Sequence, residues 1–362
     1  MAAGHLPSTP TQNALNMHPS EVLFQGNRQP LLLAACDHYA GSEKLMRKSI
    51  ALQQELGPLF DITFDCEDGA STGDEANHAL MVAALLTCDA NQFNRIGVRV
   101  HHVGSAFFAS DVEIICAAAA TRLAYLVLPK VNSVQEVIEA IELINLHAGR
   151  AGRSALPIHV LIETHGALRD VHAIAALAQV ECLSFGIMDF VSAHYGAVPG
   201  NAMRTPGQFT HPLVVRAKLE IAAACHAHGK VPSHNVTTEI KDTAVVANDA
   251  QRAAAEFGYT RMWSIHPGQI KPVIKAFTPR ASEVNEAVNI LQEAERALWG
   301  PIAQNGRLHD RASYRYYWTV LQRAKLTGLP LSEQVLALLN NPAGSARPEP
   351  HQLETIPCPS PN

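Results

Sequence analysis

The sequence predicts an α/β fold, a (β/α)8 barrel of the TIM type followed by a C-terminal helical extension. Eight short and almost entirely apolar segments occur along the chain, and amphipathic segments with helical periodicity follow most of them. Short apolar runs rich in β-branched residues are typical of parallel strands that are covered on both faces. Eight such units in series favour a closed barrel over an open sheet. The segment after the first candidate strand also lacks the glycine-rich turn of a dinucleotide-binding sheet.

The apolar runs define the candidate strands. They are residues 31–35, 61–65, 96–100, 124–128, 158–162, 182–185, 230–233 and 262–265. Residues 133–147 and 213–228 are examples of the amphipathic helices expected between them, since their apolar side chains repeat at helical spacing. The barrel is therefore predicted to span residues 29–278.

Both ends of the chain differ in composition from this central region. Residues 1–28 are rich in Pro, Ser, Asn and Gln, and they are predicted to form a flexible N-terminal arm. Residues 279–340 contain three further helical patterns, at 282–298, 310–327 and 331–339, which form the predicted helical extension. Residues 341–362 are rich in proline and are predicted to form a disordered tail.

Composition excludes several classes of protein. The chain has 362 residues, of which 47% are hydrophobic and 17% are charged, as expected for a globular protein with a sizeable core. The net charge of −5 comes with no run of Lys or Arg, so we expect no nucleic-acid partner. No stretch of 18 apolar residues and no secretory signal are found, so we expect no membrane partner and a cytoplasmic location. The seven scattered cysteines are expected to be buried, reduced thiols.

In a barrel, the residues that act on a substrate lie at the carboxyl ends of the strands, where the following loops begin. The polar residues at these ends can be read directly from the sequence. They are Asp65, Glu67, Asp68, Arg99, His101, His102, Lys130, Glu163, Asp189, Ser233, His234, Asn235 and His266. Several unpaired carboxylates at one mouth would repel one another, whereas a divalent cation would remove this repulsion. Oxygen ligands favour Mg²⁺, with Mn²⁺ as an alternative, over zinc.

Ordinary structural roles are the alternative for each of these residues. Asp68 could cap the following helix, and Arg99 could form a structural ion pair with Glu67 or Asp68, which is compatible with a catalytic role. Glu163 directly follows an apolar strand and would lie over the barrel axis, where a carboxylate needs a partner. Five histidines could be read as a second metal site, but chance clustering is favoured because no two share a ligand spacing. They are His38, His101, His102, His165 and His234.

Six short motifs occur in a fixed order along the chain. Residues 64–68 read FDCED, 98–100 VRV, 127–131 VLPKV, 161–164 LIET, 185–189 FGIMD and 265–269 IHPGQ. This series resembles the HpcH/HpaI aldolase/citrate lyase family, in particular its citrate lyase beta subunit-like and malyl-coenzyme A lyase-like members. The resemblance extends from about residue 30 to residue 326.

The resemblance implies a role for each site residue. Glu163 and Asp189 would be the protein ligands of Mg²⁺. Arg99 would bind the substrate carboxylate or the keto oxygen, and Glu67 and Asp68 would orient it. Asp310, in the motif GRLHD, would act on protons in the active site of a neighbouring subunit; its structural alternative is to cap the next helix, and the sequence leaves both open. Three residues at the ends of the fourth and sixth strands are expected to contact the substrate, namely Lys130, Gly186 and Met188.

The expected function is a Mg²⁺-dependent carbon–carbon lyase that cleaves, or condenses, a β-hydroxyacyl-coenzyme A such as citryl-, malyl- or citramalyl-coenzyme A. An aldolase acting on a free hydroxy-keto acid is the first alternative, because the loops after strands one, three and seven depart from the pattern of coenzyme A-ester members. A non-catalytic ligand-binding barrel is the second. The expected partners are a small carboxylic acid or its thioester, and other copies of the chain in a homotrimer or a multiple of trimers.

Overall fold

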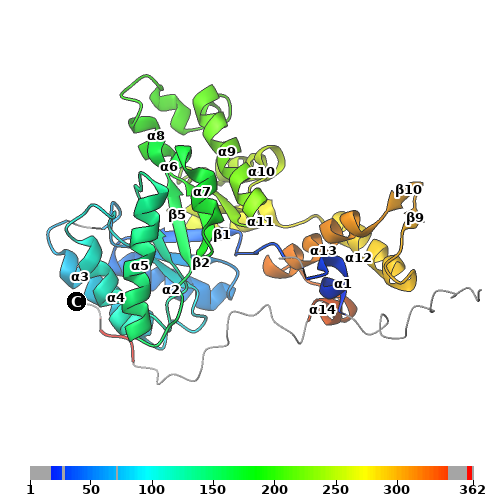
Figure 1. Ribbon diagram of the computed structural model, residues 1–362, viewed down its shortest axis with the longest axis horizontal. Helices are drawn as coiled ribbons and strands as arrows, with labels where there is room; N and C mark the ends of the chain where they lie inside the picture. The colour runs from blue at the N-terminus through cyan, green and yellow to red at the C-terminus, as the bar shows by residue number, and fades with distance from the viewer. Residues whose placement is uncertain (1–17, 27–28, 71, 341–356, 361–362) are drawn as a thin grey trace, which may run out of the picture. The chain divides into compact units, whose positions relative to one another are not determined.

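The computed structural model describes residues 18–26, 29–70, 72–340 and 357–360. Its main feature is a closed barrel of eight parallel strands, each hydrogen-bonded to the next and the last to the first (Figure 1). The strands are β1 (Cys36–Ala40), β2 (Asp61–Asp65), β3 (Ile96–Arg99), β4 (Leu126–Leu128), β5 (Ile158–Ile162), β6 (Val180–Phe185), β7 (Val231–His234) and β8 (Arg261–Ser264). This order confirms the predicted (β/α)8 barrel.

Helices connect consecutive strands and cover the outside of the barrel. They are α2 (Glu43–Leu56), α3 (Glu75–Thr87), α4 (Phe108–Ala119), α5 (Val134–Arg150), α6 (His165–Arg169), α7 (Val171–Ala176), α8 (Ile187–Ser192), α9 (Pro212–His228), α10 (Thr243–Phe257) and α11 (Pro267–Phe277), with two short 3-10 turns, η2 (Gly200–Met203) and η3 (Gly207–Phe209). The apolar faces of these helices pack on the outward side chains of the strands to form the largest core cluster.

Seven of the eight strands lie within two residues of their predicted positions, but the prediction for the first strand is wrong. Residues 31–35 are not a strand, and β1 instead spans Cys36–Ala40. Asp37 and His38 make this segment polar, so an apolar-run criterion misses it. The strand is nevertheless fully buried, because Asp37 is paired inside the barrel.

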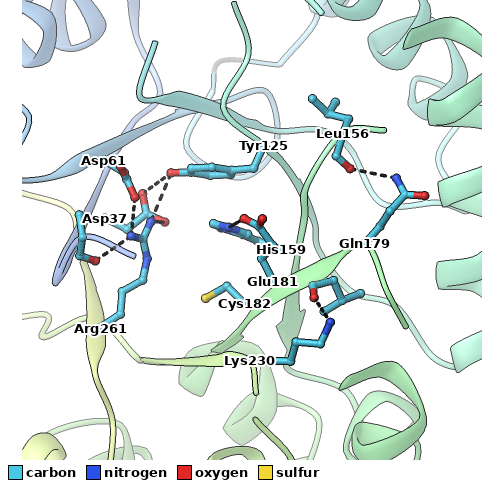
Figure 2. Close-up of polar contacts among 12 residues, drawn as sticks. Asp37, Asp61, Tyr125, Leu156, His159, Gln179, Glu181, Cys182, Lys230 and Arg261 are labelled. Atoms are coloured by element: carbon cyan, nitrogen blue, oxygen red, sulfur yellow. Dashed lines mark hydrogen bonds and ion pairs between the residues drawn. The ribbon is translucent and has the colours of Figure 1, made fainter. Parts of the chain in front are cut away.

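A charged network occupies the barrel interior near the amino-terminal ends of the strands (Figure 2). Arg261, at the start of β8, has no exposed surface, and its Nη1 and Nη2 atoms lie 2.5 Å from Asp61 Oδ2 and 3.0 Å from Asp37 Oδ2. Tyr125 donates its hydroxyl hydrogen bond to Asp37 Oδ1 at 2.9 Å, and its ring stacks on the His159 ring with centroids 3.8 Å apart. Buried charges are tolerated only when they are paired, which explains why this layer consists of ion pairs.

An apolar layer lies two residues further along the same strands. Side chains two residues apart on a strand point to the same face, so the residues that follow Asp37, Tyr125, His159 and Arg261 at this spacing also enter the barrel. They are Tyr39, Val127, Leu161 and Trp263, which belong to one buried cluster. This layer separates the charged network from the carboxyl ends of the strands.

Among the described residues, a second compact unit contains 18–26, 29–30 and 278–340, whereas the barrel unit contains 31–70, 72–277 and 357–360. The second unit is built from α1 (Pro19–Phe24), α12 (Ala281–Arg296), α13 (Arg311–Leu326), α14 (Glu333–Leu339) and the hairpin of β9 (Ile302–Gln304) and β10 (Arg307–His309). The prediction that residues 1–28 form a flexible arm is wrong for Pro19–Phe24. These residues form helix α1, which packs on α13 with Leu23 fully buried. Residues 1–17 and most of the predicted tail, 341–356 and 361–362, lie outside the described residues.

The cysteines are mostly as predicted. Five of them are free and buried, namely Cys36, Cys66, Cys116, Cys182 and Cys225. The prediction is wrong for Cys88 and Cys358, which form a disulfide that joins the end of α3 to the C-terminal segment 357–360. Arg47 of α2 also donates a hydrogen bond to the Pro359 carbonyl at 2.7 Å. None of the helices in the described residues combines the length and apolar character that a membrane crossing requires.

Candidate active site

The candidate site is built at the carboxyl ends of β2, β3, β5 and β6. Arg99 ends β3 and is only 7% exposed. It binds Asp65, the last residue of β2, with two parallel hydrogen bonds, from Nε to Oδ1 at 2.7 Å and from Nη2 to Oδ2 at 2.5 Å. The third nitrogen, Nη1, lies 3.2 Å from Glu67 Oε2. Burial alone would lower the pKa of Arg99, but Asp65 and Glu67 raise it above its ordinary value, so the guanidinium stays charged.

Lys130 extends this charged group from the loop after β4. Its Nζ atom lies 2.5 Å from Glu67 Oε1 and 2.7 Å from Asp68 Oδ2. The pKa of Lys130 is raised, since its pairing with Asp68 and Glu67 outweighs the opposite effect of burial. Glu67 is therefore shared between Lys130 and Arg99. Glu67 thus contacts Arg99 and Asp68 contacts Lys130, and the orienting roles of both residues stay predictions.

Glu163 follows β5 and is 2% exposed. Its Oε1 atom accepts a hydrogen bond from the backbone N–H of Lys130 at 2.7 Å. Burial, and next the nearby charge of Asp189, together raise the pKa of Glu163 to about 8, while Arg99 opposes the shift. Asp189 lies half-buried in the first turn of α8. The two carboxylates thus repel each other at short range, beside an arginine that is already paired.

This donor set fits a magnesium ion. Mg²⁺ prefers hard oxygen ligands and is held in proteins by one or two carboxylates, with water and substrate completing the octahedron. A cation between Glu163 and Asp189 would offset both the burial of the Glu163 charge and its repulsion by Asp189, which together raise the pKa of Glu163. The site therefore has the chemical composition expected of the predicted metal ligands, while the bound ion itself stays a prediction.

Gly186 allows Glu163 to occupy its position. A Cβ atom at residue 186 would lie 2.1 Å from Glu163 Oε2 and 2.6 Å from Glu163 Cβ. We expect Gly186→Ala to displace the Glu163 carboxylate and to weaken Mg²⁺ binding by about 10- to 100-fold. Calorimetric titration with Mg²⁺ measures this effect. The matched control is Gly149→Ala in α5, where an added Cβ meets nothing within 4 Å and binding should not change.

The raised pKa of Glu163 predicts a pH-dependent stability of the metal-free protein. The folded chain holds a proton on Glu163 up to about pH 8, whereas an ordinary glutamate releases it near 4.5. Stability contributed by this residue should therefore fall as pH rises between these two values. The test is urea unfolding in chelator from pH 5 to pH 8, compared with Glu163→Gln, which removes the titration. Identical pH profiles for the two proteins would contradict the prediction.

The remaining predicted residues lie outside this group. Met188, in α8, is 52% exposed. Asp310 lies in the second unit and caps α13, since its Oδ1 atom accepts the backbone N–H of Ala312 at 2.9 Å and that of Ser313 at 3.4 Å. The capping alternative is thus realised, and a catalytic role of Asp310 stays a prediction.

The histidines do not gather around a second metal. His38 contacts Ser264, His101 contacts Asp111, and His234 contacts Lys218. Among the described residues, the only group of three or more His, Cys, Asp or Glu side chains with ligand atoms within 4.8 Å of one another is Cys88, Asp89 and Cys358. It contains no histidine, and its two cysteines are joined in the disulfide.

Sequence reasoning missed the role of Asp65, although it noted the residue at the end of a strand. Asp65 and Arg99 are paired in the parallel register of β2 and β3, and both side chains point into the barrel. Successive side chains of a strand point to opposite faces, and this alternation along β2 and β3 could have placed both residues inside the barrel. Tyr39 was also missed, because the first strand was placed too early. Its ring lies 5.5 Å from Arg99 Cζ.

Comparison with known proteins places the chain in a family. The model of the HpcH/HpaI aldolase/citrate lyase family matches residues 57–267, which include every strand from β2 to β8. The chain belongs to this family. The resemblance predicted from the six motifs is thereby confirmed, and the chain is an enzyme of the carbon–carbon lyase class.

Several proteins similar to this chain are named as lyases or as citrate lyase. The L-malyl-CoA/beta-methylmalyl-CoA lyase of Cereibacter sphaeroides is 27% identical over 280 residues, covering 73% of this chain and 87% of the relative. A crystal structure of a citrate lyase from Burkholderia xenovorans is 56% identical, covers 89% of this chain and 99% of that one, and has a TM-score of 0.79. The Mycobacterium tuberculosis protein CitE, crystallised with magnesium, acetoacetate and coenzyme A, shares the fold at 22% identity with a TM-score of 0.61, over 83% of this chain and 99% of that one.

Proposed function

We propose that the chain is a Mg²⁺-dependent lyase that cleaves a β-hydroxyacyl-coenzyme A to an acyl-coenzyme A and a 2-keto acid, or condenses the two. The observation that carries this proposal is the buried carboxylate of Glu163 beside Asp189, with the charged Arg99 adjacent. A barrel that served only to bind ligands would have no physical need for this arrangement. The names of the Cereibacter sphaeroides and Mycobacterium tuberculosis relatives support thioester chemistry and a magnesium ion.

The side chains of this site suit an enolate-forming reaction. Cleavage removes the proton of the β-hydroxyl group, whose oxygen becomes the keto oxygen as the adjacent carbon–carbon bond breaks. The electron pair of that bond passes to the acyl fragment as an enolate, which then takes up a proton to give the acyl-coenzyme A. Bound Mg²⁺ would supply a Lewis acid that polarises the keto oxygen. Arg99 donates hydrogen bonds to the substrate carboxylate or keto oxygen, and Asp65 and Glu67 hold its guanidinium in place before the substrate arrives. Lys130 holds Glu67 from the opposite side.

We assign the proton transfer to Asp310 supplied by a second copy of the chain. Asp310→Ala should keep Mg²⁺ binding and lose turnover. Mixing Asp310→Ala subunits with Glu163→Ala subunits should restore part of the activity, since some sites then combine an intact Glu163 with an intact Asp310. No restoration on mixing would contradict sharing between subunits. The homotrimer and the cytoplasmic location stay predictions.

The experiment that tests the function is an activity screen with Mg²⁺. Citramalyl-, malyl-, β-methylmalyl- and citryl-coenzyme A are offered beside free hydroxy-keto acids, with Glu163→Ala as the control. Thioester cleavage that is absent from the variant supports the proposal. Cleavage of free acids alone would assign the chain to the aldolase alternative. No turnover on any substrate, with Mg²⁺ still bound, would favour the ligand-binding alternative.

Replacing Asp65 tests how Arg99 is held. Asp65→Asn keeps the shape of the side chain but leaves one acceptor for the two N–H groups of Arg99, and it removes the opposite charge. We expect turnover to fall about 100-fold with little change in Mg²⁺ affinity. Steady-state kinetics and Mg²⁺ calorimetry separate the two effects. Asp170→Asn is the control, since that carboxylate caps α5 on the outside of the barrel. Equal losses of turnover and of metal affinity would show that Asp65 acts on the metal ligands instead.

A further inference from the structure

Two aromatic side chains close the barrel axis beneath the candidate metal site. Tyr39 of β1 and Trp263 of β8 lie with ring centroids 4.8 Å apart and are 7% and 9% exposed. The indole Nε1–H of Trp263 donates a hydrogen bond to the carbonyl of Phe185 at 3.3 Å. Phe185 is the residue before Gly186, against which Glu163 packs. The indole is thus fixed to the same strand end that positions the metal ligands.

Tyr39 also contacts the other half of the site. Its ring lies 5.5 Å from Arg99 Cζ, within the range of a cation–π contact. Leu161 is two residues before Glu163 on β5 and completes the layer from the opposite side. A substrate fragment held by Glu163, Asp189 and Arg99 would therefore have aromatic and aliphatic side chains on its inner side.

The cations around this layer are already paired. Arg99 is bound by Asp65 and Glu67, and Lys130 by Glu67 and Asp68. Arg261 lies below the layer and pairs with its own two aspartates (Figure 2). The five carboxylates of the site, which are Asp65, Glu67, Asp68, Glu163 and Asp189, thus outnumber its two cations, Arg99 and Lys130, by three.

This balance bears on the charge of the substrate fragment. Addition of one divalent ion leaves the group with a net negative charge, and one substrate carboxylate can be held by the ion and Arg99 together. A second carboxylate on the same fragment would lie over the faces of the aromatic rings, which carry partial negative charge. Neither Arg99 nor Lys130 would be free to pair with it, since both are already bound by carboxylates. Its desolvation would then go uncompensated.

On the basis of the proposed function, we infer that Tyr39 and Trp263 determine substrate specificity, and that the 2-keto acid fragment is a monoanion with a hydrogen or a methyl group on its keto carbon. Glyoxylate and pyruvate have this chemistry. Oxaloacetate, with its second carboxylate, and 2-oxopentanoate, with its propyl group, do not. The site is thereby matched to malyl- or citramalyl-type thioesters and not to the citryl thioester.

Calorimetric titration of the full-length Mg²⁺-loaded protein tests this inference without relying on turnover. Glyoxylate or pyruvate should bind at least about tenfold more tightly than oxaloacetate and 2-oxopentanoate. Trp263→Leu should raise the affinity for 2-oxopentanoate relative to pyruvate at least about tenfold, because it opens space below the metal site. Trp263→Phe keeps an aromatic ring and should retain the preference of the unmodified protein. Tyr316→Leu, at a tyrosine that is 60% exposed on α13, is the control for loss of an aromatic ring elsewhere.

The possible outcomes separate this inference from the proposed function. If oxaloacetate binds as tightly as pyruvate, the specificity inference is wrong and the lyase proposal stands. Folding of Trp263→Leu is judged by its circular dichroism and Mg²⁺ binding. If the folded variant still prefers pyruvate over 2-oxopentanoate to the same extent, Trp263 does not limit the size of the substituent on the keto carbon. If Mg²⁺ binds but none of the four keto acids binds at millimolar concentration, both the inference and the proposed function fail.

Discussion

Replacing Glu163 with glutamine is expected to abolish Mg²⁺ binding at millimolar concentration and to lower turnover by about 1,000-fold or more. The substitution keeps the size of the side chain and its acceptor for the Lys130 N–H. It removes the buried carboxylate that lies near Asp189, and with it one of the two predicted ligands of the ion. A bound divalent ion contributes several kcal/mol of transition-state stabilisation, which corresponds to a change in rate of that order.

The measurement combines Mg²⁺ calorimetry with single-turnover kinetics on the thioester identified by the screen. Glu220→Gln is the matched control, because this glutamate forms an exposed pair with Arg216 on α9 and should leave both quantities unchanged. Glu163→Gln should also be more stable than the unmodified protein in chelator at pH 8, since the uncompensated buried charge is gone. A variant that still binds Mg²⁺ with unchanged affinity would remove Glu163 from the metal site.

The barrel could be predicted from the sequence because most of its strands are short, largely apolar runs. The prediction failed at β1, where Asp37 and His38 interrupt the apolar pattern. Asp37 can be buried only because Arg261, 224 positions later, pairs with it. No local pattern contains this information. Helix α1 was missed for a related reason, since its six residues depend on packing against α13.

The candidate site was predictable where residue type and strand position together determine the chemistry. Glu163, Asp189 and Arg99 follow from the rule that the carboxyl ends of barrel strands carry the functional groups. The choice among Asp65, Glu67 and Asp68 as the partner of Arg99 depends on which side chain faces inward, and this is settled by the register of β2 against β3. The aromatic layer depends in turn on the correct position of β1.

Arg261→Met is expected to lower the free energy of unfolding strongly. This residue lies at the end of the barrel axis opposite the active site. The guanidinium of Arg261 is fully buried and donates to Asp61, Asp37 and the Ala34 carbonyl, the last at 2.8 Å. Methionine leaves the Asp37 carboxylate buried with only the hydroxyl groups of Thr63 and Tyr125 as donors, at 2.7 and 2.9 Å. Removal of one partner of a buried ion pair typically costs about 3–5 kcal/mol, which is a large fraction of the stability of a domain.

Urea unfolding measures this cost, and two further variants assign its cause. Arg216→Met removes an exposed arginine of the same kind and should cost less than about 1 kcal/mol. Arg261→Met combined with Asp37→Leu removes both buried charges, and it should regain much of the lost stability because an apolar pair needs no charged partner. If the double variant is less stable than Arg261→Met alone, the network stabilises the barrel through its hydrogen bonds to Thr63 and Tyr125 more than through the ion pair. The interior of this barrel would then depend on a specific polar arrangement at its base, and substitutions there would be tolerated less well than substitutions in its apolar layer.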